Sequence, residues 1–463
     1  MKKEADGKGK STQTNVEFIY SLPSVHQRPV NVIRFSPNGQ YLASGGDDGA
    51  VVLWVQKYRE MDFGSSEKKL AWTCNRIFRG HSGDVYELAW SADSKYVISC
   101  SLDSSAVLFN VEKGKMVQRL EGHKKTVQGC TIDPFMKYIV TVSPDRTARV
   151  YKTTKGKAQL QFYLHHILKY RSYHKKEDDL IMSDIKQNDD EDSLSSLAYE
   201  HKQAHIMFAG ESECPAFQRR ISWSPEGSFL LLTGCIFKSA PGVKPIFTVY
   251  GFGRKNLSQP AFHLPGFEKC PLVARFCPYL FVKSPSPSQE LIDLPYTMIF
   301  AIASMDIVAI YSTQSIYPLA VVRNIHYHSI TDLAFSGDKY LLISSSDGYC
   351  SIVRFDEGVF GKKVKVEDMP LHIQPFFKDY DKIDVNDITQ FTKGAPTPVT
   401  SIFSLKGLVV ATFKSGKNKE FQLVQQTERG EPLPKAPPNQ KRVRRIVPTL
   451  ITPEPMDSDE VKS

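Results

Sequence analysis

Histidine, a hydroxyl residue and aspartate recur along the chain at a spacing that could support chemistry. In three stretches an aspartate follows a histidine by 22 positions, with a serine or threonine four positions before the aspartate. Such groups could form a nucleophile, its base and an orienting acid. They could equally form a buried hydrogen-bonded chain that stabilises a fold. The three sets are His26–Ser44–Asp48, His81–Ser99–Asp103 and His123–Thr141–Asp145.

Repetition favours the structural interpretation of these sets. A catalytic set is needed once, whereas these residues recur in step, and the second and third copies lie 42 residues apart. A fourth copy keeps His326 and Asp347 with a one-residue contraction. Each hydrogen-bonded chain would end on the aromatic residue of a third strand, and of the copies only the first has a tryptophan there, Trp54, with an N–H to donate. We therefore expect a complete network in the first copy and partial networks elsewhere.

The elements that must position these residues are short strands. The first copy contains the β-prone runs VNVIRF, YLASGG and AVVLW, separated by the turn sequences SPNG and DDG. Apolar runs of this length predict strands, and Gly, Pro, Asn and Asp clusters predict turns. A fourth run follows, and four strands per repeat of about 40 residues is typical of a β-propeller blade. Weaker half-copies lie at 219–235 and 297–314.

The composition excludes several classes of protein. Of the 463 residues 41% are hydrophobic and the net charge is +9, which suits a large folded core. Eight cysteines are scattered without a C-x-x-C pair, which predicts reduced thiols in the cytosol or nucleus. Apolar runs such as residues 229–237 are too short to cross a bilayer, so no membrane association is expected. No hydrolase, nucleotide-binding or zinc-site motif is found, so we predict no enzymatic activity, no cofactor and no metal.

The repeats resemble the WD-repeat family, and particular stretches resemble the middle subunit of chromatin assembly factor one. The resemblance covers about residues 16–360. It implies an all-β, seven-bladed WD-repeat propeller. NVEFIYSLPSVHQRPVN matches only the last strand of a first blade, so we expect that blade to be incomplete unless residues 398–413 supply strands. The stretches that carry the resemblance are VNVIRFSPNGQYLASGGDDG, RRISWSPEGSFLLLT, RKNLSQPAFHLP, LPYTMIFAIASMD and NIHYHSITDLAF with SSSDGYCSIV.

The expected domain organisation is a propeller flanked by less ordered segments. The expected boundaries are 1–15 for a disordered N-terminus, 16–365 for the propeller, about 165–215 for an acidic insertion within it, 366–430 for a segment that could contribute a strand, and 431–463 for a disordered, Pro-rich, basic tail.

The acidic insertion is longer than is usual in the family. Its residues 177–192 hold eight acidic groups and one lysine. A segment low in aromatics and high in charge is typical of a solvated, disordered loop. The alternative is an electrostatic contact for a basic partner such as a histone.

The C-terminal tail combines arginines with apolar residues. From Pro432 onward it holds seven prolines in 32 residues and no aromatic residue. Its sequence RRIVPTLI resembles the B-domain motif by which histone deposition proteins bind anti-silencing factor one. Such a segment could add to an exposed sheet edge through backbone hydrogen bonds. The resemblance assigns docking to Arg444, Arg445, Ile446, Val447, Pro448 and Leu450.

The same tail fits other roles. A nuclear import signal would use Lys441, Arg442, Arg444 and Arg445 but not the apolar residues. The two roles are compatible, and a plain solvated tail is the remaining alternative. One basic cluster without interleaved aromatics gives weak, salt-sensitive contact with nucleic acid, so we do not expect direct DNA binding.

The resemblance implies a function. It implies a nuclear, non-enzymatic scaffold subunit of a histone chaperone complex that assembles nucleosomes in DNA replication and repair, depositing histones three and four on newly replicated DNA. The implied partners are the large and small subunits of chromatin assembly factor one, anti-silencing factor one, and histones three and four. The alternatives are a replication-independent histone deposition protein and a generic WD-repeat adaptor, such as a ubiquitin-ligase substrate receptor.

Overall fold

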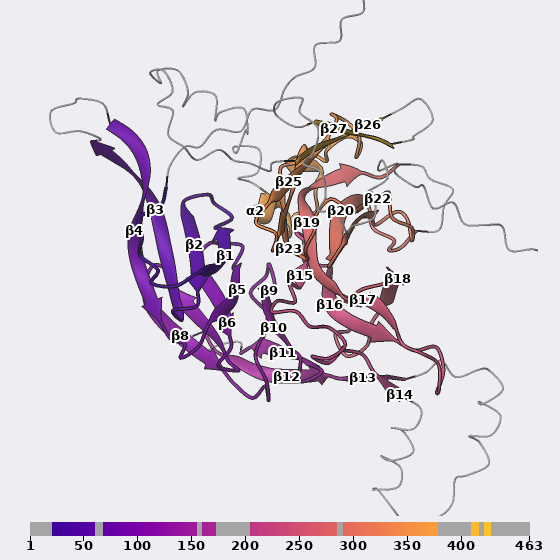
Figure 1. Cartoon of the computed structure of the whole chain (residues 1–463), viewed down its shortest axis with the longest axis horizontal. Helices are drawn as coiled ribbons and strands as arrows, with labels where there is room; N and C mark the ends of the chain where they lie inside the picture. The colour runs from indigo at the N-terminus through magenta and orange to yellow at the C-terminus, as the bar shows by residue number, and fades with distance from the viewer. Residues whose placement is uncertain are drawn as a thin grey trace, which may run out of the picture.

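Among the residues it describes, the computed structural model has six large sheets, five of four strands and one of five, arranged as blades around a common centre (Figure 1). The structure describes residues 21–60, 68–154, 160–172, 204–284, 290–377, 409–415 and 421–426. Within each of these sheets, strands that follow one another in the chain are neighbours. All of these neighbouring pairs are antiparallel except one pair in the last sheet, which is parallel. The predicted all-β WD-type propeller is therefore confirmed.

The first three blades follow the repeats found in the sequence. Blade 1 consists of β1 (Val30–Phe35), β2 (Tyr41–Gly46), β3 (Ala50–Glu60) and β4 (Lys68–Arg79). Blade 2 consists of β5 (Val85–Trp90), β6 (Tyr96–Ser101), β7 (Ala106–Asn110) and β8 (Lys115–Leu120). Blade 3 consists of β9 (Gly129–Ile132), β10 (Tyr138–Ser143), β11 (Thr147–Thr153) and β12 (Phe162–Leu168).

The other three blades include the weaker half-copies. Blade 4 consists of β15 (Ser222–Trp223), β16 (Phe229–Phe237), β17 (Ile246–Gly253) and β18 (Phe262–Phe267). Blade 5 consists of β19 (Pro271–Val282), β20 (Tyr296–Ser304), β21 (Ile307–Ser312) and β22 (Ala320–Arg323). Blade 6 consists of β23 (Ile330–Ser336), β24 (Tyr340–Ser345), β25 (Cys350–Phe355), β26 (Val409–Ser415) and β27 (Phe421–Gln426).

A two-stranded sheet, β13 (Tyr170–Ser172) with β14 (Ala204–Ile206), lies between blades 3 and 4 in the chain. The sequence suggested the range 165–215 for the acidic insertion. Strands β13 and β14 lie inside this range, and β12 overlaps its start. Strands are therefore present near both ends of that range. Residues 173–203, which include the acidic stretch 177–192, lie outside the described residues.

Alternation of side chains along the strands explains how the blades stack. On β6, Val97 belongs to the apolar cluster shared with blade 1, and Ile98 belongs to the cluster shared with blade 3. Successive residues of a strand point to opposite faces, so one strand supplies both interfaces. Apolar clusters of this kind fill the interfaces between blades 1 and 2, 2 and 3, 3 and 4, 4 and 5, and 5 and 6.

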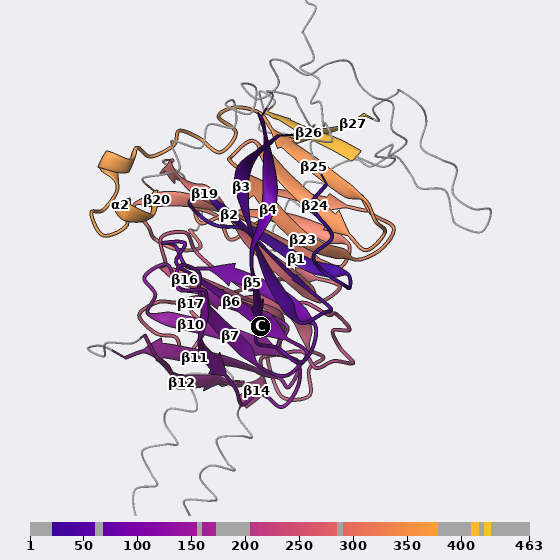
Figure 2. The same cartoon turned by 90° about the vertical axis from the view of Figure 1, so that its left-hand side faces the viewer.

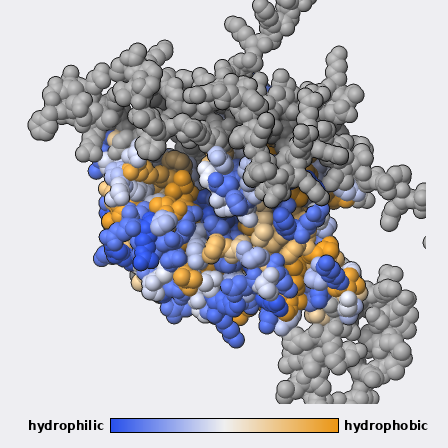
Figure 3. All heavy atoms as spheres, viewed as in Figure 1, coloured by the Kyte–Doolittle hydropathy of each residue, from blue (hydrophilic) through white to orange (hydrophobic). Residues whose placement is uncertain are grey.

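Blades 6 and 1 are different, because the buried residues of the described chain form no apolar cluster between them. The β1 side chains Ile33 and Phe35 are 55% and 62% exposed, and Leu342 of β24 is 38% exposed. Figure 3 shows an apolar area on the left of the view, where blade 1 lies. Residues 21–29 contain no strand, and residues 1–20, where the sequence suggested the last strand of an incomplete blade, lie outside the described residues.

The C-terminal strands join blade 6 and do not form a separate blade. Strand β26 pairs in parallel with β25, from Ser351 opposite Val409 to Phe355 opposite Phe413, and β27 pairs antiparallel with β26. Both strands fall within residues 366–430 and lie at the outer edge of blade 6. Residues 398–408, the first part of the segment considered for closing the ring, lie outside the described residues.

The segment that follows β25, residues 356–377, is called the strap below. It crosses to blade 5, where Val364 N–H donates to Leu280 O at 2.8 Å and Val282 N–H donates to Lys362 O at 2.8 Å. It contains the 3-10 helix η2 (Val366–Asp368) and the short helix α2 (Gln374–Phe377). Figure 2 shows α2 set apart from β25 on the far side of β20. Strap residues Met369, Ile373 and Phe377 are buried in the apolar cluster of blades 4 and 5.

One expectation about the cysteines is wrong. The scattered spacing predicted reduced thiols, but Cys214 and Cys270 form a disulfide with a Cα–Cα distance of 5.6 Å. The fold places the loop before blade 4 beside the start of β19, and both cysteines are buried. A spacing of 56 residues carries no local signal for such a pair, because only the blade packing brings the two positions together.

Candidate functional site

The first His–Ser–Asp set forms a complete hydrogen-bonded chain. His26 Nδ1 lies 3.0 Å from Asp48 Oδ1, and His26 Nε2 lies 2.8 Å from Ser44 Oγ. The indole N–H of Trp54 donates to the same Ser44 Oγ at 2.8 Å. The chain links the segment before β1, strand β2, the turn after it and strand β3. All four side chains are thus satisfied within one blade.

The next two sets repeat this geometry without the final tryptophan. His81 lies 3.0 Å from Asp103 and 2.8 Å from Ser99 Oγ. His123 lies 2.9 Å from Asp145 and 2.8 Å from Thr141 Oγ1. Phe109 carries no donor, and the Tyr151 hydroxyl donates to Glu121 O at 3.3 Å.

The fourth set, in blade 6, is shorter still. His326 Nδ1 lies 3.1 Å from Asp347 Oδ2, but its Nε2 is buried without a hydrogen-bond partner. In blade 1, Ser44 pairs with Ile33 across the two inner strands, and in blade 6 Ile343 pairs with Leu333 at the same place. Ile343 therefore occupies the position at which blades 1, 2 and 3 have a serine or threonine that hydrogen-bonds to the histidine.

Burial excludes a role for these sets as nucleophiles. The Ser44, Ser99 and Thr141 residues are 2%, 0% and 1% exposed, so no substrate reaches their hydroxyls. Burial alone would raise the pKa of Asp103, but hydrogen bonds from His81 and Ser105 outweigh it and hold the pKa well below its usual range. The carboxylates are therefore ionised acceptors that hold the turns in place.

A second set of polar groups lies where the inner strands meet, and it is called the central cluster below. It joins three arginines and two acids from five of the six blades. Arg34 Nη2 lies 2.7 Å from Glu87 Oε1, Arg34 Nη1 lies 2.6 Å from Asp332 Oδ2, and Arg220 is in contact with Glu87. The members are Arg34 of β1, Glu87 of β5, Arg220 beside β15, Arg275 of β19 and Asp332 of β23.

The charges of the central cluster are largely matched. Arg220 and Arg275 reach both acids, at 3.4 Å from Arg220 Nε to Asp332 and 3.2 Å from Arg275 to Asp332. Arg220 Nε also donates to Thr331 O at 3.0 Å. Burial raises the pKa of Glu87, but the three guanidinium groups outweigh it and lower the pKa overall. The acids and arginines of the central cluster are therefore paired with one another.

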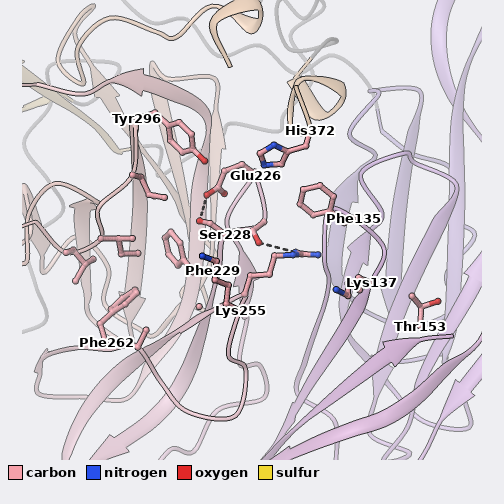
Figure 4. A pocket seen from close by; sticks show the side chains of 17 residues that line it. Phe135, Lys137, Thr153, Glu226, Ser228, Phe229, Lys255, Phe262, Tyr296 and His372 are labelled. Carbon is pink, nitrogen blue, oxygen red and sulfur yellow. Dashed lines mark hydrogen bonds between the residues drawn. The ribbon is translucent and has the colours of Figure 1, made fainter. Parts of the chain in front are cut away.

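A pocket of about 880 Å³ lies on the opposite side of the blades from the His–Asp pairs, and it is called the basal pocket below. It is formed by the turns at the starts of β10, β16 and β20 and by the strap. Figure 4 shows Phe135 and Lys137 on one side, Glu226, Phe229 and Tyr296 on the other, and His372 of the strap next to them. Its volume is in the range of ligand pockets.

The docking and import residues predicted in the tail, Lys441 to Leu450, lie outside the described residues. Within the described ranges, no group of three or more His, Cys, Asp or Glu side chains could hold a metal ion. No helix in that part of the chain is long and apolar enough to span a membrane.

Comparison with known proteins gives the family. Residues 7–360 match the model of the CAF1B/HIR1 β-propeller domain. The chain belongs to this family. It is 35% identical over 376 residues to the B subunit of chromatin assembly factor 1 of Mus musculus, covering 77% of this chain and 60% of the relative. It is 37% identical over 348 residues to the chromatin assembly factor 1 subunit FAS2 homolog of Oryza sativa subsp. japonica, covering 74% and 63%.

A more distant relative is Protein HIR1 of Yarrowia lipolytica, 26% identical over 375 residues, which cover 74% of this chain and 31% of HIR1. The matched region spans 60% to 63% of the length of the mouse and rice relatives. The family assignment therefore rests on the propeller.

Sequence reasoning missed the central cluster and the basal pocket. A signal for the cluster was present, because Glu87 and Asp332 each stand six positions after a repeat histidine, on an inner strand made mainly of apolar residues. A charge in such a strand must be paired. The pocket had no comparable signal, because Glu226 belongs to a turn sequence, SPEG, that resembles the other turns.

Proposed function

We propose that the chain is a non-enzymatic scaffold subunit of a nuclear histone chaperone complex that assembles nucleosomes by depositing histones three and four on newly replicated DNA. The observation that carries the proposal is the match to the mouse and rice chromatin assembly factor 1 proteins at 35% and 37% identity, against 26% for Protein HIR1. The architecture is compatible with a scaffold, because the recurring His, Ser and Asp groups are used inside the blades.

The proposed partners are the large and small subunits of chromatin assembly factor one, with histones three and four. Docking of anti-silencing factor one is assigned to the tail. Arg444 or Arg445 would form a two-pronged contact with a partner carboxylate, which lysine cannot copy. Ile446 and Leu450 would enter shallow apolar pockets, and Pro448, which lacks an N–H, would end the strand pairing. Lys441 and Arg442 would add to the nuclear import signal.

A second candidate is replication-independent histone deposition. The match to Protein HIR1 favours it, since the family model covers both groups of proteins. The two candidates differ in their partner subunits. Purification of the tagged chain from its own cells, followed by mass spectrometry, separates them: recovery of the large and small subunits of chromatin assembly factor one supports the proposal, and their absence contradicts it.

The docking assignment is tested with purified anti-silencing factor one. Replacing both Arg444 and Arg445 with alanine should abolish binding in a pull-down and leave the thermal unfolding of the propeller unchanged. A matched control replaces Lys417 and Lys419, which are basic residues outside the motif, with alanine and should bind normally. Binding that survives the double arginine change would overturn the assignment.

A further inference from the structure

The disulfide closes a loop that precedes blade 4. Residues 210–218 form this loop, which is called the latch loop below, and they contain no strand. Cys214 of the latch loop is bonded to Cys270, which stands directly before β19 of blade 5. The other six of the eight cysteines are free thiols. The bond therefore ties the latch loop to the next blade in the chain.

The ion pairs that hold the latch loop lie at the surface. Glu211 Oε2 lies 2.6 Å from Lys125 Nζ, and Glu213 Oε2 lies 3.6 Å from Arg146 Nη2. All four of these side chains are substantially exposed. Exposed ion pairs contribute little to stability, because water solvates both partners. Phe217, the aromatic residue of the loop, is 73% exposed and does not fix it either.

The buried side of the latch loop depends on the disulfide. Cys214 and Cys270 lie together in the apolar cluster of blades 5 and 6, and Ala216 packs against the edge of that cluster. Gln128 Nε2 donates to Ala216 O at 2.6 Å. An alanine side chain buries little apolar surface, and one hydrogen bond adds a modest amount. Breaking the disulfide would therefore remove the strongest restraint on the loop.

A buried charge lies at the base of the latch loop. Arg219 is fully buried, and its Nη1 and Nη2 donate to Ala209 O at 2.8 Å and to Gly210 O at 3.3 Å. Its Nε has no hydrogen-bond partner, and the acids of the loop pair with Lys125 and Arg146 instead of with this guanidinium. A buried cation held mainly by carbonyl groups is unfavourable, and contact with water would relieve the cost. The closed position of the loop is therefore opposed by the charge at its base.

The latch loop also has room to move. A cavity of about 640 Å³ separates its first residues, Gly210, Glu211 and Ser212, from residues 144–146 in the turn of blade 3. A segment that borders a cavity and is held by exposed contacts belongs to the part of a fold that opens most easily. The disulfide counteracts this tendency in the structure.

We propose that the Cys214–Cys270 disulfide is a redox latch on the loop of residues 210–218. While the bond is intact, the latch loop stays closed on Arg219. When the bond is reduced, the loop opens, water reaches the guanidinium, and the surface in front of blade 4 changes shape. This device responds to the thiol–disulfide balance around the protein and does not depend on the docking motif of the tail.

The reductant is a protein dithiol or two molecules of a small thiol such as glutathione. A thiolate attacks one sulfur of the disulfide, the S–S bond breaks, and the other cysteine leaves as a thiolate that takes a proton from water. The second thiol then attacks the mixed disulfide and releases the first cysteine. The two electrons come from the reductant, which becomes a disulfide, and an excess of its oxidised form reverses the reaction. Because both cysteines are buried, the attack requires a brief lifting of the loop.

The test measures hydrogen–deuterium exchange of the full chain by mass spectrometry, in protein kept oxidised and in protein reduced with dithiothreitol. In the closed loop the Cys214 N–H donates to Gly210 O at 3.0 Å, and the Ala216 N–H donates to Cys214 O at 2.9 Å. Reduction should speed the exchange of peptides that cover residues 210–218 about tenfold or more, because these hydrogen bonds open with the loop. Exchange in the strands of blades 1 and 2 should stay unchanged.

Two double variants serve as controls. Cys214→Ser combined with Cys270→Ser should show the fast exchange without reductant, and dithiothreitol should have no further effect on it. Cys74→Ser combined with Cys350→Ser removes two exposed free thiols and should behave like the unmodified protein. Thermal melts establish that each variant is folded. If the first variant does not fold, the comparison of oxidised with reduced unmodified protein still decides the question.

Three outcomes would overturn the proposal. The first is a peptide map of the non-reduced protein in which Cys214 and Cys270 are not linked. The second is equal exchange of residues 210–218 in oxidised and reduced protein. The third is faster exchange across all blades on reduction, which would mean that the bond holds the whole propeller and not a separate loop.

Discussion

Arg34 Nη1 and Asp332 Oδ2 lie 2.6 Å apart and join the inner strands of the first and last blades. No apolar cluster of described residues fills the interface between these blades, so this ion pair is a principal contact between them. Burial raises the pKa of Asp332, but Arg220, Arg34 and Arg275 outweigh it and hold the pKa far below its usual range. The carboxylate is therefore ionised and shared by three guanidinium groups.

Replacing Asp332 with asparagine should lower the free energy of unfolding by about 3 kcal/mol, because three largely buried arginines would then share one acid. Urea unfolding followed by tryptophan fluorescence measures the change. Asp338→Asn is the control, since Asp338 forms an ion pair with Lys363 nearer the surface and should cost less than about 1 kcal/mol. Equal costs for the two changes would show that the central cluster does not hold the blades.

Ser44→Ala should destabilise the protein more than Ser99→Ala. Ser44 Oγ serves both His26 Nε2 and the Trp54 N–H, whereas Ser99 Oγ serves His81 and makes a longer contact of 3.4 Å to Val107 O. Ser44→Ala leaves two buried groups, on His26 and Trp54, without a hydrogen-bond partner, which costs about 2–4 kcal/mol of stability. Ser99→Ala leaves one such group, on His81, which costs about 1–2 kcal/mol. Thermal unfolding of both variants checks the order, and the reverse order would rule out the tryptophan as the end of the chain.

Stability should fall in acid, because the blade aspartates have lowered pKa values. Hydrogen bonds from His81 and Ser105 to Asp103, and from His123 and Thr147 to Asp145, outweigh the burial that would raise the pKa of each carboxyl. A carboxyl with a lowered pKa in the folded state stabilises fully above its unfolded value, about 4, and loses this as the pH falls through the folded value. The melting temperature should fall as the pH is lowered from 6 to 3. The fall should be smaller for Asp103→Asn than for the unmodified protein.

Glu226 should have the opposite pH dependence. Burial raises the pKa of its carboxyl, against smaller opposing effects of Ser224 and Ser228. Its favourable contribution is therefore complete below about pH 4 and is lost as the pH rises through the folded value. Glu226→Gln should raise the melting temperature at pH 8 and change it little at pH 4. Glu357→Gln, at an exposed position, is the control. An equal rise in melting temperature for this variant would show that burial of Glu226 is not the cause of the effect.

The disulfide predicts a thiol count. Protein purified without reductant and unfolded in guanidinium should titrate six free thiols of the eight cysteines, because Cys214 and Cys270 are paired. Reduction should restore eight and lower the unfolding free energy by about 4 kcal/mol or less, the loop-closure limit for this spacing. Eight thiols before reduction would contradict the pairing.

The fold could be predicted because its signal repeats. Each His–Asp spacing, apolar run and turn sequence reinforced the others, and the His–Asp pairs lie within 3.1 Å at all four places where the repeat puts them. The half-copies at 219–235 and 297–314 correspond to β15 with β16 and to β20 with β21. Local sequence patterns are enough to predict such strands, because the alternation of side chains between the two faces of a strand involves only consecutive residues.

The contacts between distant segments could not be predicted in the same way. Arg34 and Asp332, Cys214 and Cys270, and the strap with blade 5 meet only because the blades close around one centre. Each contact involves residues whose neighbours in sequence carry no information about the partner. Glu226 looked like a turn residue because its sequence is one, and the pocket around it becomes visible only in the fold.

The strap has a practical consequence for anyone shortening this chain. The family match ends at residue 360, before Met369, Ile373 and Phe377 enter the cluster of blades 4 and 5. A fragment cut at that boundary would retain the inner strands of every sheet and their far-ultraviolet signature. It would nevertheless expose Phe229 and its neighbours to water and would lose one wall of the basal pocket. Such a fragment would therefore aggregate more readily than the full chain.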